Sequence, residues 1–317
     1  PSRDSMTSST ALLKMPRVLS LAQLDDQDLS PSRLLWRQQW LLIKLPTIAS
    51  RRRPMQSVPA LQNRQWFEAC LARSPVKGIR ADMSLGEETI RSWAMACRRT
   101  HKRIFVCLPS GTRLPKSRSP LAWGFKRLAD WLIAASLLVV LSPLFLMLAV
   151  LVRWDSPGPI FFRQWRIGYR GELFQILKFR TMQADAEQIH HQVMGKQSGI
   201  HKLKNDPRIT RVGRWLRKYS LDELPQLLNV LRGEMSLVGP RPWALYDAMR
   251  IEPALQGRLN ALPGITGAWQ VTERSNNCNL SAVSQLDLDY LKRWTVLRDF
   301  QLLLMTVPKV FSGLGAY

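Results

Sequence analysis

The sequence has little cysteine, little histidine and few acidic side chains. Its 317 residues include 4 Cys, 4 His and only 23 Asp and Glu. The cysteines are Cys70, Cys97, Cys107 and Cys278, and they form no C-x-x-C pair and have no histidine at metal-ligand spacing. A disulfide framework or a zinc site is therefore not what organises the chain, and this cysteine usage is typical of a protein inside the cell. No secretory signal pattern opens the sequence.

Basic and apolar side chains are abundant instead. The 46 Lys and Arg give a formal charge of +23, and 46% of the residues are hydrophobic. A chain this long and this apolar is neither a disulfide-stapled mini-protein nor mostly disordered. The charge predicts an anionic partner, which is nucleic acid, an anionic membrane surface or a phosphorylated small molecule.

We expect two domains, over residues 1–118 and 119–317. Prolines through residues 1–60 predict irregular structure. Beyond them, 77–82 and 103–108 read as strands, and a capping box at Ser84 and Glu87 opens a helix between them. This small α/β unit is followed by a basic, Pro/Ser-rich linker over 109–120, and no chemistry is evident in either.

One long apolar run indicates a membrane-inserted protein. Residues 131–152 carry no charge and would form a helix of about 33 Å, long enough for a bilayer core of about 30 Å. Ser142-Pro143 interrupts the run and predicts a break or kink. Because both flanks are basic, we favour a helix-break-helix that enters and leaves through the cytoplasmic leaflet over a kinked spanning helix.

The fold expected after this insert is α+β and mostly helical. Residues 160–164 and 172–180 predict a small β-hairpin around 168–171. The C-terminal stretch 283–311 has helical spacing, and it is either an amphipathic helix on the membrane face or ordinary core.

The densest group of polar side chains follows the hairpin. Arg208, Arg211, Arg214 and Arg217 recur every three residues, so on a helix they form a basic stripe. This stripe is either a phosphate-binding wall or a surface facing solvent and lipid headgroups.

An acidic pair, Asp222 and Glu223, comes next. With Ser220 and Pro225 around it, the pair reads alone as helix capping. The alternative is chemical, in which one carboxylate attacks a phosphoryl group and its neighbour holds Mg²⁺.

Two further segments are suited to phosphate recognition. Arg241 lies between two prolines, which hold its backbone stiffly. The loop 263–270 contains glycines that permit close backbone approach.

Seven motifs in order resemble one family. They are Ser142-Pro143 in its apolar run, DSPGPIFF (155–162), LKFRTM (177–182), NDPRIT (205–210), SLDELPQLLNVLRGEMSLVGPRP (220–242), PGITGAWQV (263–271) and LDLDY (286–290). Over residues 126–317 the chain resembles the bacterial sugar transferases, which are monotopic polyprenyl-phosphate glycosyl-1-phosphate transferases. The N-terminal part more faintly resembles the cyanobacterial exopolysaccharide members, and it lacks the four spanning helices of the long colanic-acid-type enzymes.

The resemblance implies a fold, a reaction and a set of site residues. It implies transfer of a sugar-1-phosphate from a UDP-sugar to undecaprenyl or another polyprenyl phosphate, with release of UMP and a need for Mg²⁺. Asp222 matches the nucleophile, and Glu223 matches the residue that supports the metal. Lys178, Arg241 and Asp287 match other active-site positions, and Arg217 belongs to the basic stripe beside them. The family's insert is re-entrant and broken at the Ser-Pro pair.

The resemblance also places the protein. It implies the cytoplasmic face of the bacterial inner membrane, anionic lipid as a partner, and a role in initiating exopolysaccharide or glycoconjugate assembly. Residues 276–279 depart from the usual pattern, so the sugar stays open, as does the oligomeric state, homodimer included. The competing classes are a membrane-anchored nucleic-acid binder and a scaffold. Missing nucleic-acid-binding motifs argue against the first, and the intact Asp-Glu pair argues against the second.

Overall fold

The computed structural model describes residues 33–37, 39–44, 63–109, 114–183, 186, 206–272 and 280–312. The chain divides into two compact units, Pro1–Ile104 and Phe105–Tyr317. Each unit is described by itself. The stretch 276–279 that bears on the sugar lies outside the described residues, as does the Arg51–Arg53 run.

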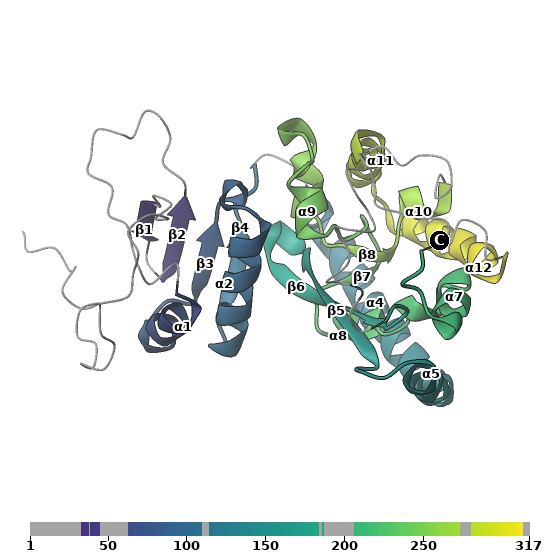
Figure 1. Cartoon of the computed structure of the whole chain (residues 1–317). Helices are drawn as coiled ribbons and strands as arrows, with labels where there is room; N and C mark the ends of the chain where they lie inside the picture. Colours follow the sequence, from purple (N-terminus) through teal and green to yellow (C-terminus); the bar gives the residue numbers. More distant parts are fainter. Residues whose placement is uncertain are drawn as a thin grey trace, which may run out of the picture. The chain divides into compact units, whose positions relative to one another are not determined.

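The N-terminal unit is built on one sheet of order β1-β2-β3-β4 (Figure 1). Its strands are β1 (Arg33–Arg37), β2 (Trp40–Lys44), β3 (Gly78–Ala81) and β4 (Arg103–Val106), and its helices are α1 (Arg64–Arg73) and α2 (Glu87–Arg99). β1 and β2 run antiparallel, and β2 and β3 run parallel. The rings of Phe67 and Trp93 join α1 to α2, with centroids 5.6 Å apart.

Two expectations for this unit are wrong. Residues 33–44 form a hairpin, because the apolar pairs Leu34–Ile43 and Leu35–Leu42 lie in register. The capping box is also absent from the described helix α2, which begins after Gly86 without a side-chain cap. Asp82 instead caps a short 3-10 turn, η5 (Met83–Leu85), where its carboxylate accepts from Ser84 N at 3.0 Å. In the second unit, the described part of the expected linker is more ordered than predicted, because Leu114 is buried and α3 covers Pro115–Arg118.

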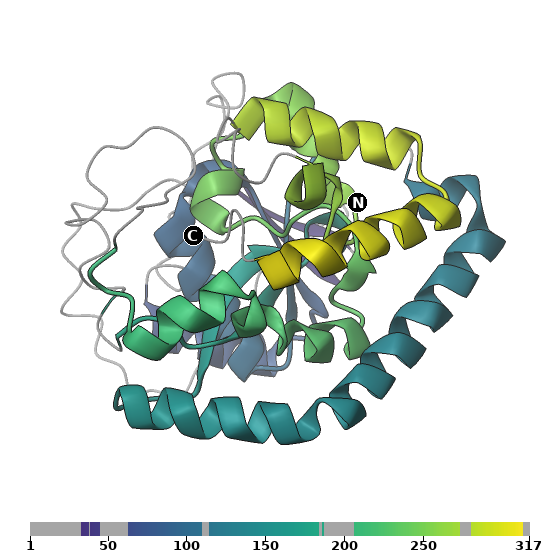
Figure 2. The same cartoon turned by 90° about the vertical axis from the view of Figure 1, so that its right-hand side faces the viewer.

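The apolar run forms two helices, α4 (Pro120–Val140) and α5 (Ser142–Asp155), bent by 64° at Leu141 (Figure 2). Pro143 has no N–H to donate to the carbonyl of Val139, four residues earlier. The hydroxyl of Ser142 donates to that carbonyl instead, at 2.8 Å. The predicted break at the Ser-Pro pair is therefore confirmed to within one residue, and α4 begins eleven residues before the predicted run.

The polarity of this helix pair is inverted relative to a soluble protein. Lys126 and Asp130 are buried, whereas Leu132 is 60% exposed and Val139 is 74% exposed. In the described part of the chain no single helix is long and apolar enough to cross a membrane, but the bent pair meets that standard together.

The rest of the second unit is mostly helical, with two small sheets. The predicted hairpin is confirmed as antiparallel β5 (Phe161–Ile167) and β6 (Leu173–Phe179), joined through a short 3-10 turn, η6 (Tyr169–Gly171). The other described elements are α7 (Arg211–Lys218), η7 (Leu221–Glu223), α8 (Gln226–Leu231), β7 (Ser236–Val238), α9 (Leu245–Ala248), η8 (Pro253–Asn260), β8 (Gly264–Thr266), α10 (Ala268–Thr272), α11 (Leu280–Lys292) and α12 (Val296–Ser312).

The close backbone approach predicted for residues 263–270 is confirmed. β7 and β8 pair in parallel, and a Cβ on Gly264 would lie 2.1 Å from the backbone nitrogen of Gly239. A Cβ on Gly267 would lie 2.2 Å from the Gly239 carbonyl oxygen. Only glycine fits at either position, so the chain that leads from β7 to Arg241 is held against the loop after β8.

The two alternatives for residues 283–311 divide between two helices. α11 buries Val283, Tyr290 and Leu291 and is part of the core. α12 buries Leu302 but leaves apolar side chains exposed, namely Leu297, Phe300, Leu304, Met305 and Val307. The amphipathic alternative therefore applies to α12 alone.

Candidate active site

The acidic pair lies on a tight turn between two helices. Asp222 and Glu223 belong to η7, and Pro225 precedes α8. Ser220 adopts the left-handed region, with φ 55°, and its side chain makes no capping hydrogen bond in this described turn. The side-chain cap that the capping alternative expects from Ser220 is therefore absent, although both acids do lie in the first turn of η7. Asp222 is nonetheless buried, at 8% exposed, which is costly for a carboxylate that serves no purpose there.

Lys178 joins the acidic pair from strand β6. Its Nζ donates to Glu223 Oε1 at 2.7 Å and lies 4.0 Å from Asp222 Oδ2. In the hairpin Lys178 pairs with Phe162 of β5, and its side chain extends to Glu223 of η7. Asp222 and Glu223 together are called the dyad. Lys178 and Asp222 of this dyad are 44 residues apart in the sequence, and the fold brings them together as predicted.

Two arginines supply further positive charge near Asp222. Arg217, at the end of α7, donates from Nε to Thr181 Oγ1 at 2.8 Å. Arg241 lies over the ring of Trp269, with its guanidinium carbon 5.9 Å from the ring centroid. Burial raises the pKa of Asp222 above its ordinary value; Lys178 opposes this, Glu223 adds to it, and the two arginines again oppose it.

The predicted basic stripe divides into two parts. Arg208 is outside α7 and is buried in an ion pair with Asp206, at 2.6 Å between Nη2 and Oδ2. Arg211 and Arg214 are exposed on α7, while Arg217 turns inward to the dyad. A continuous stripe of four arginines is therefore wrong, because the helix begins only at Arg211 and its N-cap is Thr210.

Asp287 stands behind the site rather than at the dyad. It forms a buried ion pair with Arg258. Arg258 also donates to the Arg241 carbonyl oxygen at 3.0 Å and lies 4.9 Å from the centroid of the Trp243 ring. Burial raises the pKa of Asp287, and Arg258 opposes that rise. Asp287 is thus joined to the predicted site through Arg258 and the backbone of Arg241.

An open depression lies beside the dyad. Lys178, Glu223 and Arg241 line it together with Arg166, Gln226 and Gln270. The last three were missed as site residues, although Gln270 ends the predicted glycine loop 263–270. Sequence spacing gave no signal for them, because β5, α8 and α10 converge only in the folded chain.

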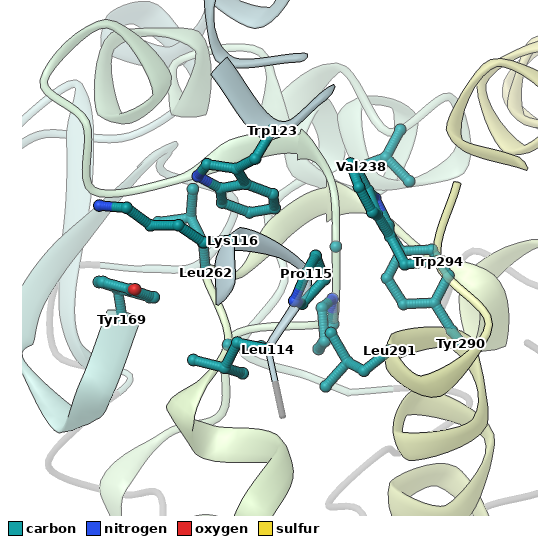
Figure 3. Close-up of a pocket in the computed structure, with 13 residues that line it drawn as sticks. Leu114, Pro115, Lys116, Trp123, Tyr169, Val238, Leu262, Tyr290, Leu291 and Trp294 are labelled. Atoms are coloured by element: carbon teal, nitrogen blue, oxygen red, sulfur yellow. The ribbon is translucent and has the colours of Figure 1, made fainter. Parts of the chain in front are cut away.

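A second depression is lined in part by the Gly239-Pro240 segment (Figure 3). Trp123, Trp294 and Lys116 line it, and it includes no predicted site residue.

A divalent cation at the dyad would need help from a ligand. In the described part of the chain no group of three or more His, Cys, Asp or Glu could hold a metal ion. Two adjacent carboxylates nevertheless fit Mg²⁺, which proteins hold by one or two carboxylates plus substrate phosphates.

The comparisons with known proteins point to one family. The profile described as "Bacterial sugar transferase" matches residues 121–313. The exopolysaccharide production protein ExoY of Sinorhizobium fredii is 40% identical over 205 residues, which cover 62% of this chain and 90% of that protein. A UDP-glucose:undecaprenyl-phosphate glucose-1-phosphate transferase of Caulobacter vibrioides is 44% identical over 200 residues, 61% of this chain and 72% of that protein. An undecaprenyl-phosphate galactose phosphotransferase of Salmonella typhimurium is 40% identical over 199 residues, 61% of this chain and 41% of that protein. None of these relatives bears on the cyanobacterial expectation.

Proposed function

Because the chain belongs to the bacterial sugar transferase family, we propose that it transfers a sugar-1-phosphate from a UDP-sugar to undecaprenyl phosphate and so initiates exopolysaccharide synthesis. The single observation that carries the proposal is the buried Asp222, held 4.0 Å from Lys178 and next to Glu223, two residues that line a depression together with Arg166 and Arg241. A nucleophilic carboxylate needs this setting, in which positive charge receives the phosphates and burial limits hydrolysis.

The chemistry proposed for Asp222 has two balanced steps. A carboxylate oxygen of Asp222 attacks the phosphorus that bears the sugar, and the bond to the bridging oxygen breaks. UMP leaves with that electron pair, and a phosphosugar remains on Asp222. A phosphate oxygen of the polyprenyl phosphate then attacks the same phosphorus, the bond to Asp222 breaks, and the carboxylate is restored.

The neighbouring residues have separate roles in this proposal. Lys178 and Arg241 bind phosphate oxygens of the donor, and Arg217 attracts the acceptor phosphate. Glu223, with the donor's own phosphate oxygens, would hold Mg²⁺, which when bound neutralises phosphate charge. Asp287 acts through Arg258 as a positioning residue for Arg241.

We also propose that α4 and α5 form a re-entrant insert in the cytoplasmic leaflet of the inner membrane. The two acidic residues nearest the ends of the uncharged run are bonded to the same compact unit. The Asp130 carboxylate accepts from Ser236 Oγ at 2.7 Å, and the Asp155 carboxylate accepts from Val212 N at 3.0 Å. A spanning pair would carry one of these two residues to the opposite side of the bilayer.

Anionic lipid is the proposed partner of the surface beside α5. Arg211, Arg214 and Lys218 are exposed on α7, Trp215 is 43% exposed, and Trp154 at the end of α5 is 83% exposed. Tryptophan and cationic side chains together are typical of a protein surface at the headgroup level. The proposed catalytic domain covers residues 119–317, and residues 1–118 have no assigned role.

The test of the nucleophile uses the full chain in nanodiscs with undecaprenyl phosphate and Mg²⁺. We expect wild-type protein to release UMP from UDP-glucose or UDP-galactose and to carry a phosphohexose adduct on Asp222 by mass spectrometry. Asp222→Asn should lose both the adduct and at least about a thousandfold in turnover, as expected when a covalent route is removed. Asp289→Asn, a control at a half-exposed side chain on α11, should behave as wild type. Wild-type turnover by Asp222→Asn would refute the assignment.

A further inference from the structure

Two polar side chains in the depression beside the dyad are incompletely hydrogen-bonded. Gln270 is 8% exposed, and its Oε1 is buried without a hydrogen-bond partner among the described residues. Arg166 donates from Nη1 to the Pro242 carbonyl oxygen at 3.2 Å and from Nη2 to Gln164. Its Nε is likewise buried and lacks a partner in the described part of the chain. Native proteins contain few such groups, so each of them calls for an explanation.

The hydrogen bond of Nε2 fixes the orientation of the Gln270 amide. Its Nε2 donates to the Ile265 carbonyl oxygen at 2.9 Å. Exchanging the two amide atoms would set Oε1 against that carbonyl, acceptor against acceptor. Oε1 therefore points away from the Ile265 carbonyl, and it lies beside Gly267, where an added Cβ would be 3.3 Å away.

The Arg166 side chain, which comes from the hairpin, is also held in place by hydrogen bonds. It comes from β5, its guanidinium holds the backbone of Pro242, and it therefore stands next to Arg241. Burial lowers the pKa of Arg166, and the like charge of the nearby Arg241 lowers it further, while Tyr246, Asp247 and Glu223 oppose the shift. A phosphate beside Arg166 would relieve this cost, because an anion favours the charged guanidinium.

Arg166 and Gln270 both line the depression, and they leave one donor and one acceptor without a partner in the described part of the chain. Lys178 and Arg241 line the same depression, so a ligand here carries phosphate. A ligand that satisfies Gln270 Oε1 must in addition present an O–H or N–H group. A nucleoside diphosphate sugar carries both kinds of group, the phosphates and an O–H or N–H group, in one molecule.

We propose that Arg166 and Gln270 recognise the donor, Arg166 Nε by donating to a phosphoryl oxygen and Gln270 Oε1 by accepting from an O–H or N–H group of the UDP-sugar. The inference rests on the proposed function and assigns to it two residues that the family motifs did not single out. The group that Gln270 reads is either a sugar hydroxyl or the uracil N–H.

The experiment measures donor binding without turnover. The full chain carrying Asp222→Asn, in nanodiscs with Mg²⁺, is titrated calorimetrically with UDP-glucose, with UDP-galactose and with UMP. Gln270→Leu in this background should weaken binding of the cognate UDP-sugar roughly tenfold, as loss of one buried hydrogen bond implies. Arg166→Lys, which keeps the charge but lacks Nε, should weaken both UDP-sugar and UMP.

The chain offers a matched control in Gln256. Its Nε2 donates to the Ile251 carbonyl oxygen at 3.1 Å, five residues back, as Gln270 does to Ile265. Gln256→Leu removes the same kind of local bond away from the depression and should leave the donor affinity unchanged. If Gln270→Leu fails to fold, Gln270→Glu keeps the size and the acceptor and should weaken binding by repelling the phosphates.

The outcomes separate the source of the hydrogen bond. An equal loss for UMP and UDP-sugar assigns Gln270 to the uracil, and a loss for UDP-sugar alone assigns it to the sugar. A donor affinity within twofold of the parent for both Gln270→Leu and Arg166→Lys overturns the inference while the proposed function stands. If the Asp222→Asn parent binds no UDP-sugar and the wild type releases no UMP, the proposed function fails and the inference with it.

Discussion

The carboxylate of Asp299 joins three elements of the second unit at one buried point. Its Oδ2 lies 2.7 Å from Lys126 Nζ of α4 and accepts from Trp294 Nε1 at 3.1 Å, while its Oδ1 accepts from Tyr290 OH at 2.6 Å. The side chains of Lys126 and Asp299 are only 5% and 7% exposed. The pair therefore fixes the base of α4 to the first turn of α12.

We expect Asp299→Asn to destabilise the protein by about 3 kcal/mol, the lower end of the range for breaking a buried ion pair. The lower end applies because Asp130 still lies 3.6 Å from Lys126, although Asp130 already accepts from Arg127 and Ser236. The amide also continues to serve Tyr290 and Trp294 if its nitrogen faces the tyrosine hydroxyl. For a domain of this size such a loss lowers the melting temperature by about 6–12 °C.

The assay is thermal unfolding in nanodiscs, followed by the fluorescence of the protein's 12 tryptophans. Asp289→Asn is the matched control, because it breaks an ion pair with Lys292 whose side chains are 50% and 69% exposed. Surface pairs contribute roughly 0–1 kcal/mol, so the control should shift the melting temperature by no more than about 4 °C.

A double variant tests the mechanism itself. Lys126→Met with Asp299→Asn removes both charges, so no buried ammonium is left without its partner, and we expect it to recover at least half of the lost stability. The reasoning is refuted if Asp299→Asn melts like the Asp289→Asn control. It is equally refuted if the double variant is less stable than the single one.

Two further predictions concern the site and its support. Asp222→Asn should raise the melting temperature at pH 7, because burial raises the pKa of Asp222 in the folded state. A group of this kind contributes its stability at low pH and loses it as pH rises, so the gain should vanish below about pH 4; an equal gain at every pH would contradict the cause. Gly264→Ala should lower stability by about 3 kcal/mol, because its Cβ would lie 2.1 Å from the Gly239 nitrogen. Gly124→Ala, where a Cβ meets nothing within 4 Å, is the control, and equal melting temperatures for the two alanine variants would rule out the clash.

The elements that the sequence predicts well are those whose signal is local. The break at Ser142-Pro143 follows from the missing proline N–H, and the hairpin follows from two apolar strands around glycines. The hairpin over residues 33–44 was missed because scattered prolines outweighed a short apolar pairing. The capping boxes at Ser84 and Ser220 were wrong because the motif describes spacing, whereas capping also needs an extended backbone, and Ser220 is left-handed.

The site could be predicted only as far as its motifs reach. Lys178, Glu223 and Arg241 were identified through family motifs, and the structure brings them to one depression. Arg166 and Gln270 carry no local signal, because their significance comes from atoms left without partners in the folded chain. For Asp287 the opposite holds. A family motif identifies this residue, but its ion pair is with Arg258 and not with a residue of the dyad.

Strand β6 connects the proposed membrane insert to the dyad in the space of four residues. Lys178 reaches Glu223 at 2.7 Å, and Arg180, two residues on, donates to the Pro157 carbonyl oxygen at 3.0 Å and to Ser156 Oγ at 2.8 Å just beyond α5. Thr181, the next residue, accepts from Arg217. The end of α5 also caps α7 through Asp155, so the helix that carries Arg217 and the strand that carries Lys178 are both fixed to the insert. The helix pair and two of the cations near Asp222 are therefore joined by direct hydrogen bonds rather than by a free linker.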